Sequence, residues 1–296
     1  LQQFLTDNFD EVGSDLIDYI PTDLQDHPSF LDYIESDEYR EWATELNQKW
    51  GSMGKQLASD VAANPQRHSF VSIAYPMIVP GGRFRESYYW DSWWILKGLL
   101  VCDMAESAMN VVNILLDQVA EFGYVPNGGR IYYLDRSQPP VLSEMILDMC
   151  VYFKWSPDDI ATLLASAVPL LETEYNWWMD PANGHIVTDL TSQQPKGAGS
   201  YTLNRYYSNG TTPRPESYLE DVTNGDSKSF WRNVRTGAET GWDFSSRWIG
   251  GDGHSIRNIA ATGMFLVYYV AFYCLLLYYI VLYPHYTCLS FALFSL

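Results

Sequence analysis

Apolar residues recur at helical spacing through much of the chain, and the segments between them are polar and rich in Gly, Pro and Asn. The clearest case is residues 103–121, where apolar side chains three or four positions apart define one face of a helix. Those positions are Met104, Ala108, Val111, Val112, Leu115, Leu116 and Val119. Similar reasoning predicts helices over residues 87–100, 139–153 and 156–179, and another that starts within "RPESYLEDV". Successive helices with long loops and few alternating strands predict an all-α domain of helical hairpins.

A longer helix is predicted over residues 35–63, because its apolar positions gather on one side. They are Tyr39, Trp42, Leu46, Trp50, Leu57 and Val61. Local signals mark other helix ends: "SPDD" places Pro157 in a first turn, with two acids near the positive end of the helix dipole. Asp103 and Glu106 form an expected capping pair, and Gly123 ends the helix that they open.

The end of the sequence changes character. Residues 258–296 contain no Asp, Glu, Lys or Arg, and residues 264–283 are apolar and long enough to cross a bilayer. Tyrosines run through that segment and no basic residue follows, whereas membrane helices usually carry both at their ends. We therefore expect a domain over residues 1–257 and an unrelated hydrophobic tail over 258–296. A splice or gene-model junction is favoured over a membrane anchor.

Composition narrows the classes of partner. The net charge of −18 repels nucleic acid and anionic membrane surfaces, so neither is expected as a partner. No cysteine lies in a CxxC pair and the histidines lack metal-binding spacing, so no metal is expected. The sequon Asn209-Gly210-Thr211 favours an extracellular or membrane-associated protein over a cytoplasmic one.

Four loops, each close to a helix start, gather arginines, acids and carboxamides among aromatic rings. They read "PGGRFRESYYWDSWW", "PNGGRIYYLDRSQPP", "PRPESY" and "ETGWDFSSRW". Loops at one end of a helical scaffold are where binding groups collect. These side chains supply the donors and acceptors that a polyhydroxylated ligand needs, and tryptophan offers an apolar face. Phosphate would favour arginines with fewer acids nearby, so a sugar fits better.

In this order the four loops closely resemble those of the trehalases, glycoside hydrolases that split α,α-trehalose into two glucoses. The resemblance covers roughly residues 1–260. It implies an (α/α)6 toroid with the pocket at its mouth, an inverting reaction on a disaccharide substrate, and no cofactor. The sugar-binding positions that it implies are Arg83, Trp90, Asp91, Asn127, Arg136, Gln138, Arg214, Glu216 and the backbone of Gly241.

Asp243 matches the catalytic acid of the family. Trp242 and Phe244 flank it, and partial desolvation would raise the pKa of its carboxyl and keep it protonated. Structural readings stay open beside this one. Asp243 is also compatible with a helix cap, Arg83 and Glu86 with a surface ion pair worth less than about 1 kcal/mol.

Two further positions have such readings: Asn127 is compatible with a turn residue and Arg214 with an exposed loop residue. Because four loops agree at once, the set as a whole favours a sugar site.

The second half of the family pattern is absent. The resemblance implies a later signature with a Gln-Trp-Asp core, then a glutamate base, and neither follows Arg257. We expect an incomplete toroid with poor solubility, and very weak hydrolysis, because losing a general base commonly costs ~10²–10⁴-fold. Three alternatives stay open: another (α/α)6 glycosidase, a sugar-binding isoform without turnover, and a membrane-tethered chain.

Overall fold

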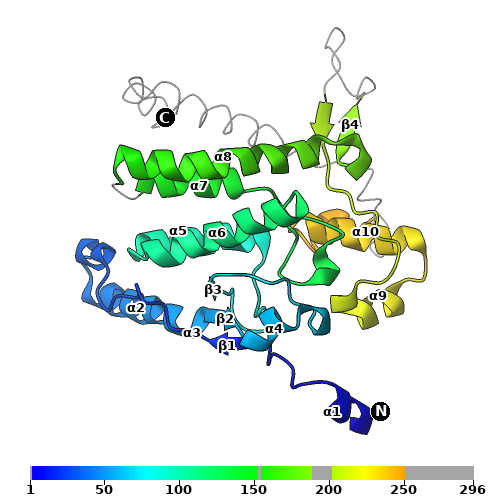
Figure 1. Ribbon diagram of the computed structural model, residues 1–296, viewed down its shortest axis with the longest axis horizontal. Coiled ribbons are helices and arrows are strands. Elements are labelled where there is room, and N and C mark those ends of the chain that lie inside the picture. The colour runs from blue at the N-terminus through cyan, green and yellow to red at the C-terminus, as the bar shows by residue number, and fades with distance from the viewer. Residues whose placement is uncertain (1, 153–154, 189–201, 251–296) are drawn as a thin grey trace. The chain divides into compact units, whose positions relative to one another are not determined.

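The structure is a computed structural model that describes residues 2–152, 155–188 and 202–250. The chain divides into two compact units, here called unit 1 (residues 1–114 and 128–131) and unit 2 (residues 115–127 and 132–296). Figure 1 labels most of their helices and strands. The predictions for residues 258–296, with the apolar segment 264–283, lie outside the described residues.

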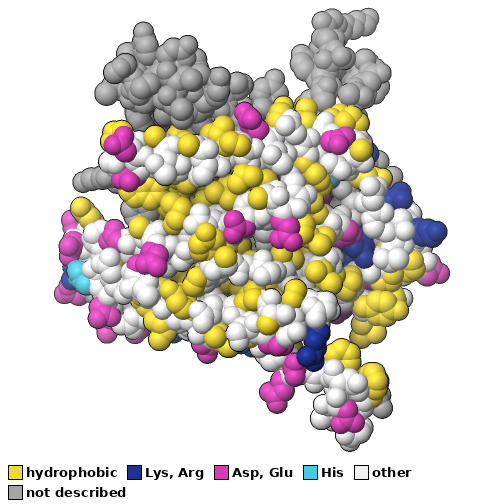
Figure 2. Space-filling view, viewed as in Figure 1, with side chains coloured by type: hydrophobic (Ala, Val, Ile, Leu, Met, Phe, Trp, Pro, Cys, Tyr) yellow, Lys and Arg dark blue, Asp and Glu magenta, His cyan; other side chains and the backbone are white. Residues whose placement is uncertain are grey.

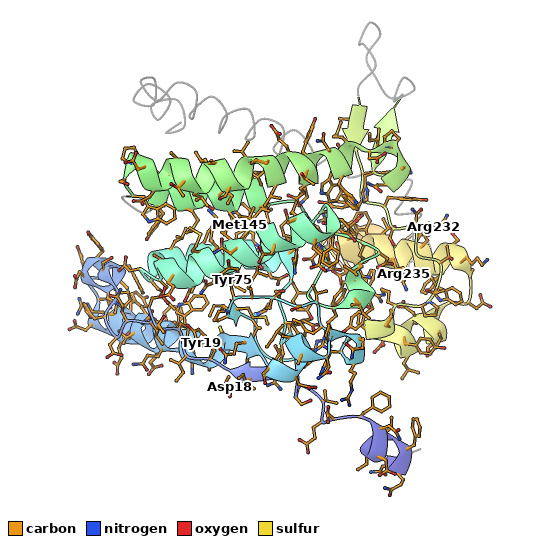
Figure 3. The ribbon with its side chains drawn as sticks, viewed as in Figure 1. Asp18, Tyr19, Tyr75, Met145, Arg232 and Arg235 are labelled. Carbon is orange, nitrogen blue, oxygen red and sulfur yellow. The ribbon has the colours of Figure 1, made fainter. Side chains whose placement is uncertain are left out.

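A three-stranded antiparallel sheet, which the sequence patterns did not predict, organises unit 1. Strand β1 (Leu16–Asp18) pairs with β2 (Gly54–Leu57), which also pairs with β3 (Met77–Ile78). A core cluster beside the strands contains Val61, Phe70, Met77, Val79 and Ile114. Lys55 on β2 is largely buried and forms an ion pair with Asp18, which is labelled in Figure 3. Three short helical elements also belong to this unit: α1 (Gln2–Asn8), η1 (Ser29–Tyr33) and η2 (Pro65–Arg67).

The single helix predicted over residues 35–63 is wrong. The chain forms α2 (Asp37–Gln48), α3 (Trp50–Met53), strand β2, and α4 (Ser59–Ala63). Gly54 gives the reason, because a Cβ at that position would lie 2.0 Å from the backbone oxygen of Tyr19. The predicted apolar face is split as well: Tyr39, Trp42 and Leu46 are 62%, 60% and 50% exposed, whereas Val61 is fully buried.

The next two predicted helices are confirmed as α5 (Tyr89–Val101) and α6 (Ala105–Phe122). The predicted capping pair of α6 is wrong, since Asp103 and Glu106 accept hydrogen bonds from the N-terminal loop at 2.7 and 3.0 Å. Asp23 occupies the capping role. Its carboxylate accepts from the backbone N–H of Ser107 at 2.8 Å and from the Ser107 hydroxyl at 2.5 Å. A cap that comes from 84 residues earlier leaves no local pattern.

Replacing Asp23 with alanine is therefore expected to destabilise the protein by ~0.5–2 kcal/mol, the usual loss for a helix N-cap. Both hydrogen bonds to Ser107 disappear while the rest of the loop is unchanged. Asp26→Ala is the matched control, because Asp26 is an exposed acid in the same loop. Chemical denaturation of both variants measures the difference, and equal stabilities would contradict the capping role.

Unit 2 contains a pair of helices at their predicted positions, α7 (Leu142–Tyr152) and α8 (Pro157–Met179), which lie side by side (Figure 1). A reciprocal capping box starts α8. The Ser156 hydroxyl accepts from the Asp159 N–H at 3.2 Å, and the Asp159 carboxylate accepts from the Ser156 N–H at 3.2 Å. Pro157 occupies the first turn, as "SPDD" predicts.

The remainder of unit 2 mixes predicted and unpredicted elements. The predicted turn after α8 is present as η4 (Pro181–Asn183), and α9 (Tyr218–Asn224) follows η6 (Pro215–Ser217) as expected. Strands β4 (Ile186–Thr188) and β5 (Thr202–Asn204) form an unpredicted antiparallel pair. Helix α10 (Lys228–Glu239) also went unpredicted. Its C-terminal part is buried although largely polar, so no apolar stripe marks it: Asn233, Val234, Arg235, Thr236, Gly237, Ala238 and Glu239.

Helices dominate both units, which confirms the predicted all-α class and agrees with the (α/α)6 toroid that the resemblance implies. None of the helices described combines the length and apolar character needed to cross a membrane. Acidic side chains are spread over the face seen in Figure 2, whereas basic ones gather in a few places. This distribution accords with the net charge of −18.

Candidate active site

The first predicted loop belongs to unit 1 and presents Arg83 at the tip of a tight turn. Gly81 and Phe84 exchange backbone hydrogen bonds at 3.1 and 3.0 Å, and Gly81 has a left-handed φ of 99°. Arg83 is exposed, with its guanidinium carbon 4.9 Å from the centre of the Phe84 ring. Trp90 and Asp91 follow in the first turn of α5 and are half-buried. One short segment thus carries three of the predicted sugar-binding residues.

Glu86 of the same loop is a structural residue. Its side chain is buried, ion-paired with Arg130, and accepts a hydrogen bond from the Tyr88 hydroxyl at 3.0 Å. Arg130 also pairs with Asp15 at 2.7 Å. Burial opposes the charged form of Arg130, but the two carboxylates outweigh it and raise the pKa of this guanidinium. A surface pair between Arg83 and Glu86 is therefore ruled out.

Arg136 is the centre of a polar cluster in unit 2. Its side chain is 2% exposed, and its Nε donates to Asn127 Oδ1 at 2.6 Å while Nη2 donates to Glu216. The Asn127 N–H donates back to the Arg136 carbonyl at 3.0 Å, so the two residues are joined twice. Three predicted site residues are thereby in direct contact, although Arg136 and Glu216 are 80 positions apart.

Arg214 is buried at 6% exposure, so the reading of it as an exposed loop residue is wrong. Asp221 holds it in place. Nε and Nη2 of Arg214 donate to that carboxylate at 3.0 and 2.7 Å, and the Arg214 backbone N–H donates at 2.8 Å. Among the described residues, Nη1 has no hydrogen-bond partner.

Asp243 approaches this cluster from the end of α10. Gly241, with a left-handed φ of 69°, lets the chain turn away from the helix. The Asp243 side chain reaches solvent, yet enough protein surrounds it that partial desolvation raises the pKa of its carboxyl. Its own backbone hydrogen bond, Arg214 and Arg136 lower that pKa and Glu216 raises it; the net shift is upward.

The cap reading for Asp243 is wrong, because Ser245 caps the short helix η7 (Ser246–Trp248) that follows. Its neighbour Phe244 lies over Arg214, with the ring centre 5.0 Å from the guanidinium carbon. That contact joins the third and fourth predicted loops within unit 2.

The upward shift predicts a specific titration. In ¹³C NMR, the Asp243 carboxyl is expected to titrate with a midpoint above its ordinary value of 3.8. A carboxyl whose pKa is higher in the folded than in the unfolded chain favours folding when protonated. The stability of the protein relative to Asp243→Asn should therefore fall as pH rises through the folded-state pKa. Removing the Glu216 charge with Glu216→Gln should lower the midpoint, and a midpoint at or below 3.8 in the unaltered protein would contradict the environment described.

Unit 2 thus brings five predicted residues into one neighbourhood: Asn127, Arg136, Arg214, Glu216 and Asp243. Gln138 is buried two positions after Arg136, and Gly241 lies two positions before Asp243. That Arg83, Trp90 and Asp91 of unit 1 act at the same site stays a prediction.

Sequence reasoning missed the residues that hold this cluster. Asp221 fixes Arg214, and Asp135 accepts from Arg136 at 3.4 Å and pairs with Arg235 on α10, which is labelled in Figure 3. Arg235 in turn donates to the carbonyl oxygens of Thr212 and Pro213, each at 2.9 Å. Asp221 and Arg235 lie outside the four quoted loops, so the sequence did not indicate their roles. Asp135 lies within the second loop, and its position next to Arg136 was the one indication that the sequence offered.

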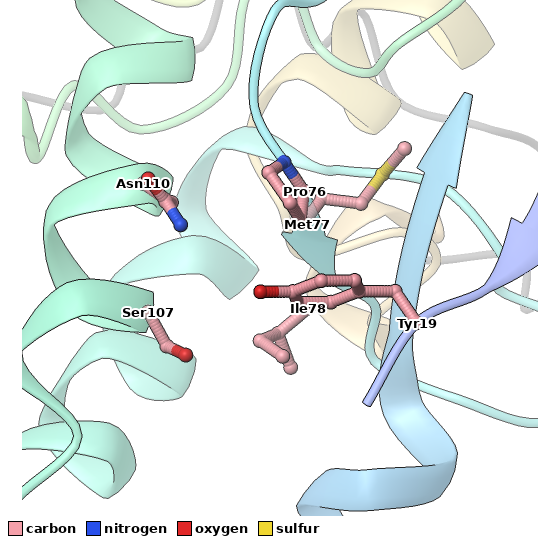
Figure 4. Close-up of a pocket in the computed structure, with 6 residues that line it drawn as sticks. All are labelled: Tyr19, Pro76, Met77, Ile78, Ser107 and Asn110. Carbon is pink, nitrogen blue, oxygen red and sulfur yellow. The ribbon is translucent and has the colours of Figure 1, made fainter. Parts of the chain in front are cut away.

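A small pocket in unit 1 is lined by none of the predicted site residues (Figure 4). It is lined by Tyr19, Pro76, Met77, Ile78, Ser107 and Asn110, and its volume for a water-sized sphere is about 0 Å³. Ligand pockets are usually larger, about 300–1,000 Å³, so this one is no candidate for a disaccharide. Within the described part of the chain, no group of three or more His, Cys, Asp or Glu side chains is arranged to hold a metal ion.

The family model described as Trehalase matches residues 1–275 of the chain. That match runs past residue 257 into residues that the structure does not describe, so the expected boundary there stays a prediction. The chain is similar to the trehalase of Homo sapiens, 39% identical over 282 residues that cover 93% of this chain and 46% of that protein. It is similar to the trehalase of Apis mellifera, 39% identical over 266 residues that cover 88% and 40%.

Among solved structures, the neutral trehalase of Saccharomyces cerevisiae is similar, with a TM-score of 0.45 and 28% identity, covering 58% of this chain and 34% of that one. The chain spans less than half the length of these relatives. A family model that matches nearly the whole chain, together with relatives at this identity, decides the classification: the chain belongs to the trehalase family.

Proposed function

We propose that this chain supplies the general acid and sugar-binding residues of a glycosidase site. That site binds α,α-trehalose and hydrolyses it with inversion. The observation that carries the proposal is the cluster around Arg136, where two arginines, a carboxamide and two carboxylates converge within unit 2. We further propose that residues 1–257 are part of the catalytic domain and that residues 258–296 are distinct from it.

Asp243 is the proposed general acid. An inverting hydrolysis needs a protonated carboxyl to give its proton to the leaving oxygen, while a carboxylate roughly 6.5–9.5 Å away activates water on the opposite face. The raised pKa of Asp243 supports the first role, because the proton is retained to a higher pH than in an ordinary aspartate. The family's base motif does not occur in residues 1–296, so we assign the second role to none of them.

The proposed sugar-binding groups are Arg136, Asn127 and Glu216. Glu216 and Asn127 hold the Arg136 guanidinium in one orientation, so its hydrogen-bonding directions are fixed before a ligand arrives. The Nη1 of Arg214 adds a donor near Asp243, because the Arg214 charge lies close enough to lower the pKa of the Asp243 carboxyl. An ordered set of donors and acceptors of this kind selects a hydroxyl pattern, because a mismatched sugar leaves buried polar groups unpaired.

The test is calorimetric titration of the full chain with trehalose, with maltose and sucrose as comparison disaccharides. Preferential binding of trehalose is expected, and its loss on Glu216→Gln would locate the site. Absence of trehalose binding at millimolar concentration, or equal binding of maltose, would overturn the proposal.

A sugar-binding chain without turnover is the second candidate, because the ordered cluster around Arg136 supports binding independently of a base. Measuring glucose release in parallel with binding separates the two. Hydrolysis that disappears in Asp243→Asn supports a catalytic chain, whereas trehalose binding with no release supports the binding-only alternative.

A further inference from the structure

Glu239, the last residue of α10, carries a fully buried carboxylate that no sugar-binding role explains. Oε1 accepts from the Ser137 N–H at 3.0 Å, and Oε2 accepts from the Tyr207 N–H at 2.5 Å. Nε2 of His185 lies 3.0 and 3.2 Å from the two oxygens. Two backbone amides and an imidazole therefore surround one carboxylate, all within unit 2.

A negative charge at this position is energetically unfavourable, which suggests that the carboxylate has a specific role. A buried carboxylate costs free energy on desolvation, and the C-terminal end of a helix carries partial negative charge that repels it further. A neutral side chain would fill the same space without either cost. Three donors offset the cost here, and each comes from a different segment, 102, 54 and 32 positions away along the chain.

The segments that Glu239 joins are those that carry the proposed sugar site. Ser137 stands between Arg136 and Gln138, so its N–H fixes the backbone of that loop. On the other side, Gly241 and Asp243 follow Glu239 by two and four positions. The Glu239 carboxylate thus connects the proposed sugar-binding loop at Arg136–Gln138 with the loop that bears the proposed acid, Asp243.

His185 is the side-chain partner of the Glu239 carboxylate. It is 2% exposed, and its ring lies 4.7 Å from Trp177 and 4.4 Å from Trp178, measured between centroids. Facing two carboxylate oxygens, Nε2 acts as the donor, and Nδ1 has no hydrogen-bond partner in the described part of the chain. The ring packing leaves the imidazole little room to turn away.

We propose that Glu239, supported by His185, is a positioning residue that aligns the Arg136–Gln138 loop with the Gly241–Asp243 loop for sugar binding. This inference rests on the proposed function, because alignment has a purpose only if the two loops share a ligand. Glu239 itself touches backbone amides and His185 and is assigned no contact with the sugar.

The decisive variant is Glu239→Gln, which keeps the shape but places an NH₂ group against one of the donors. Trehalose affinity measured by calorimetry is expected to fall at least about tenfold, the scale set by the loss of one hydrogen bond to a charged group. The Asp243 carboxyl midpoint should shift as well, since its loop is no longer held. Leu164→Ala, a buried α8 position away from both loops, is the control for general destabilisation and should leave the affinity unchanged.

Two His185 variants test the support separately. His185→Gln retains an N–H donor for Glu239 and is expected to keep trehalose affinity within about threefold. His185→Phe retains a ring but no donor, so its trehalose affinity should fall as much as that of Glu239→Gln. These variants also decide the matter if Glu239→Gln fails to fold. Unchanged affinity in every folded variant that removes the donor or the carboxylate would overturn the inference.

Amide hydrogen exchange separates this inference from the proposed function. If the unaltered protein binds no trehalose, the function fails, but exchange at Ser137 and Tyr207 still reports whether Glu239 holds the two segments. About tenfold faster exchange at both amides in Glu239→Gln, without a change in α7 and α8, would support the positioning role. Unchanged exchange at both amides would overturn it whatever the sugar result.

Discussion

Replacing Arg136 with methionine is expected to destabilise the protein by about 3–5 kcal/mol and to abolish trehalose binding, because breaking a buried ion pair strands its partners. The substitution keeps the length of the side chain but removes the donors to Asn127 and Glu216. Asn127 is 4% exposed and would be left with an unpaired oxygen. The Glu216 side chain is 18% exposed, so water partly compensates for its loss and the lower end of the range is expected.

Two controls define what the Arg136 variant reports. Arg136→Lys keeps the charge but cannot reach two partners with a planar fork, so it should recover part of the stability and little of the affinity. Arg67→Met removes an exposed arginine and is expected to change the free energy of unfolding by less than about 0.5 kcal/mol. Chemical denaturation and calorimetry measure the two effects. An Arg136→Met protein as stable as Arg67→Met would contradict the role of Arg136 as the centre of the cluster.

Helix prediction from the pattern of apolar residues succeeded where one apolar face continues through a single helix, as in α6 and α8. The start of α8 is also local: Ser156 and Asp159 form a capping box, Pro157 occupies the first turn, and α8 begins where these residues predict. Helix prediction failed over residues 35–63, because Gly54 is placed by the backbone of Tyr19, a contact between positions distant in sequence. Helix α10 was missed for a related reason: its buried part is polar, since it serves the loops around it rather than an apolar core.

The candidate site likewise contains residues that the sequence could predict and residues that it could not. Residue types such as Arg136 and Asp243 could be selected from loop motifs, since sugar binding and acid catalysis require those chemical groups. The partners that orient them could not. Asp221 belongs to a helix that shows no other sign of function. Glu239 is the first residue of the acid motif "ETGWDFSSRW", but nothing in that motif indicates that it faces Ser137. What the motifs could not give is the contact that each partner makes in the folded chain.

Asp221 therefore gives the second large effect. Asp221→Ala is expected to cost about 3–5 kcal/mol, because Arg214 would keep a buried charge without its partner. At present burial opposes the charged form of Arg214, and the Asp221 carboxylate outweighs burial and raises the pKa of the guanidinium. Asp221→Asn keeps one acceptor oxygen and should fall between the unaltered protein and the alanine variant.

Loss of Asp221 should also weaken trehalose binding, since the direction of Arg214 Nη1 depends on the two nitrogens that Asp221 anchors. A decrease of about tenfold or more is expected for Asp221→Ala, the scale of one charge-assisted hydrogen bond. Glu220→Ala, one position earlier on α9 and exposed, is the matched control and should change neither quantity. If Asp221→Ala lowered stability but left the trehalose affinity at the level of Glu220→Ala, Asp221 would be a purely structural residue. Arg214 would then contribute nothing to sugar binding, and the site would rest on Arg136, Asn127 and Glu216 alone.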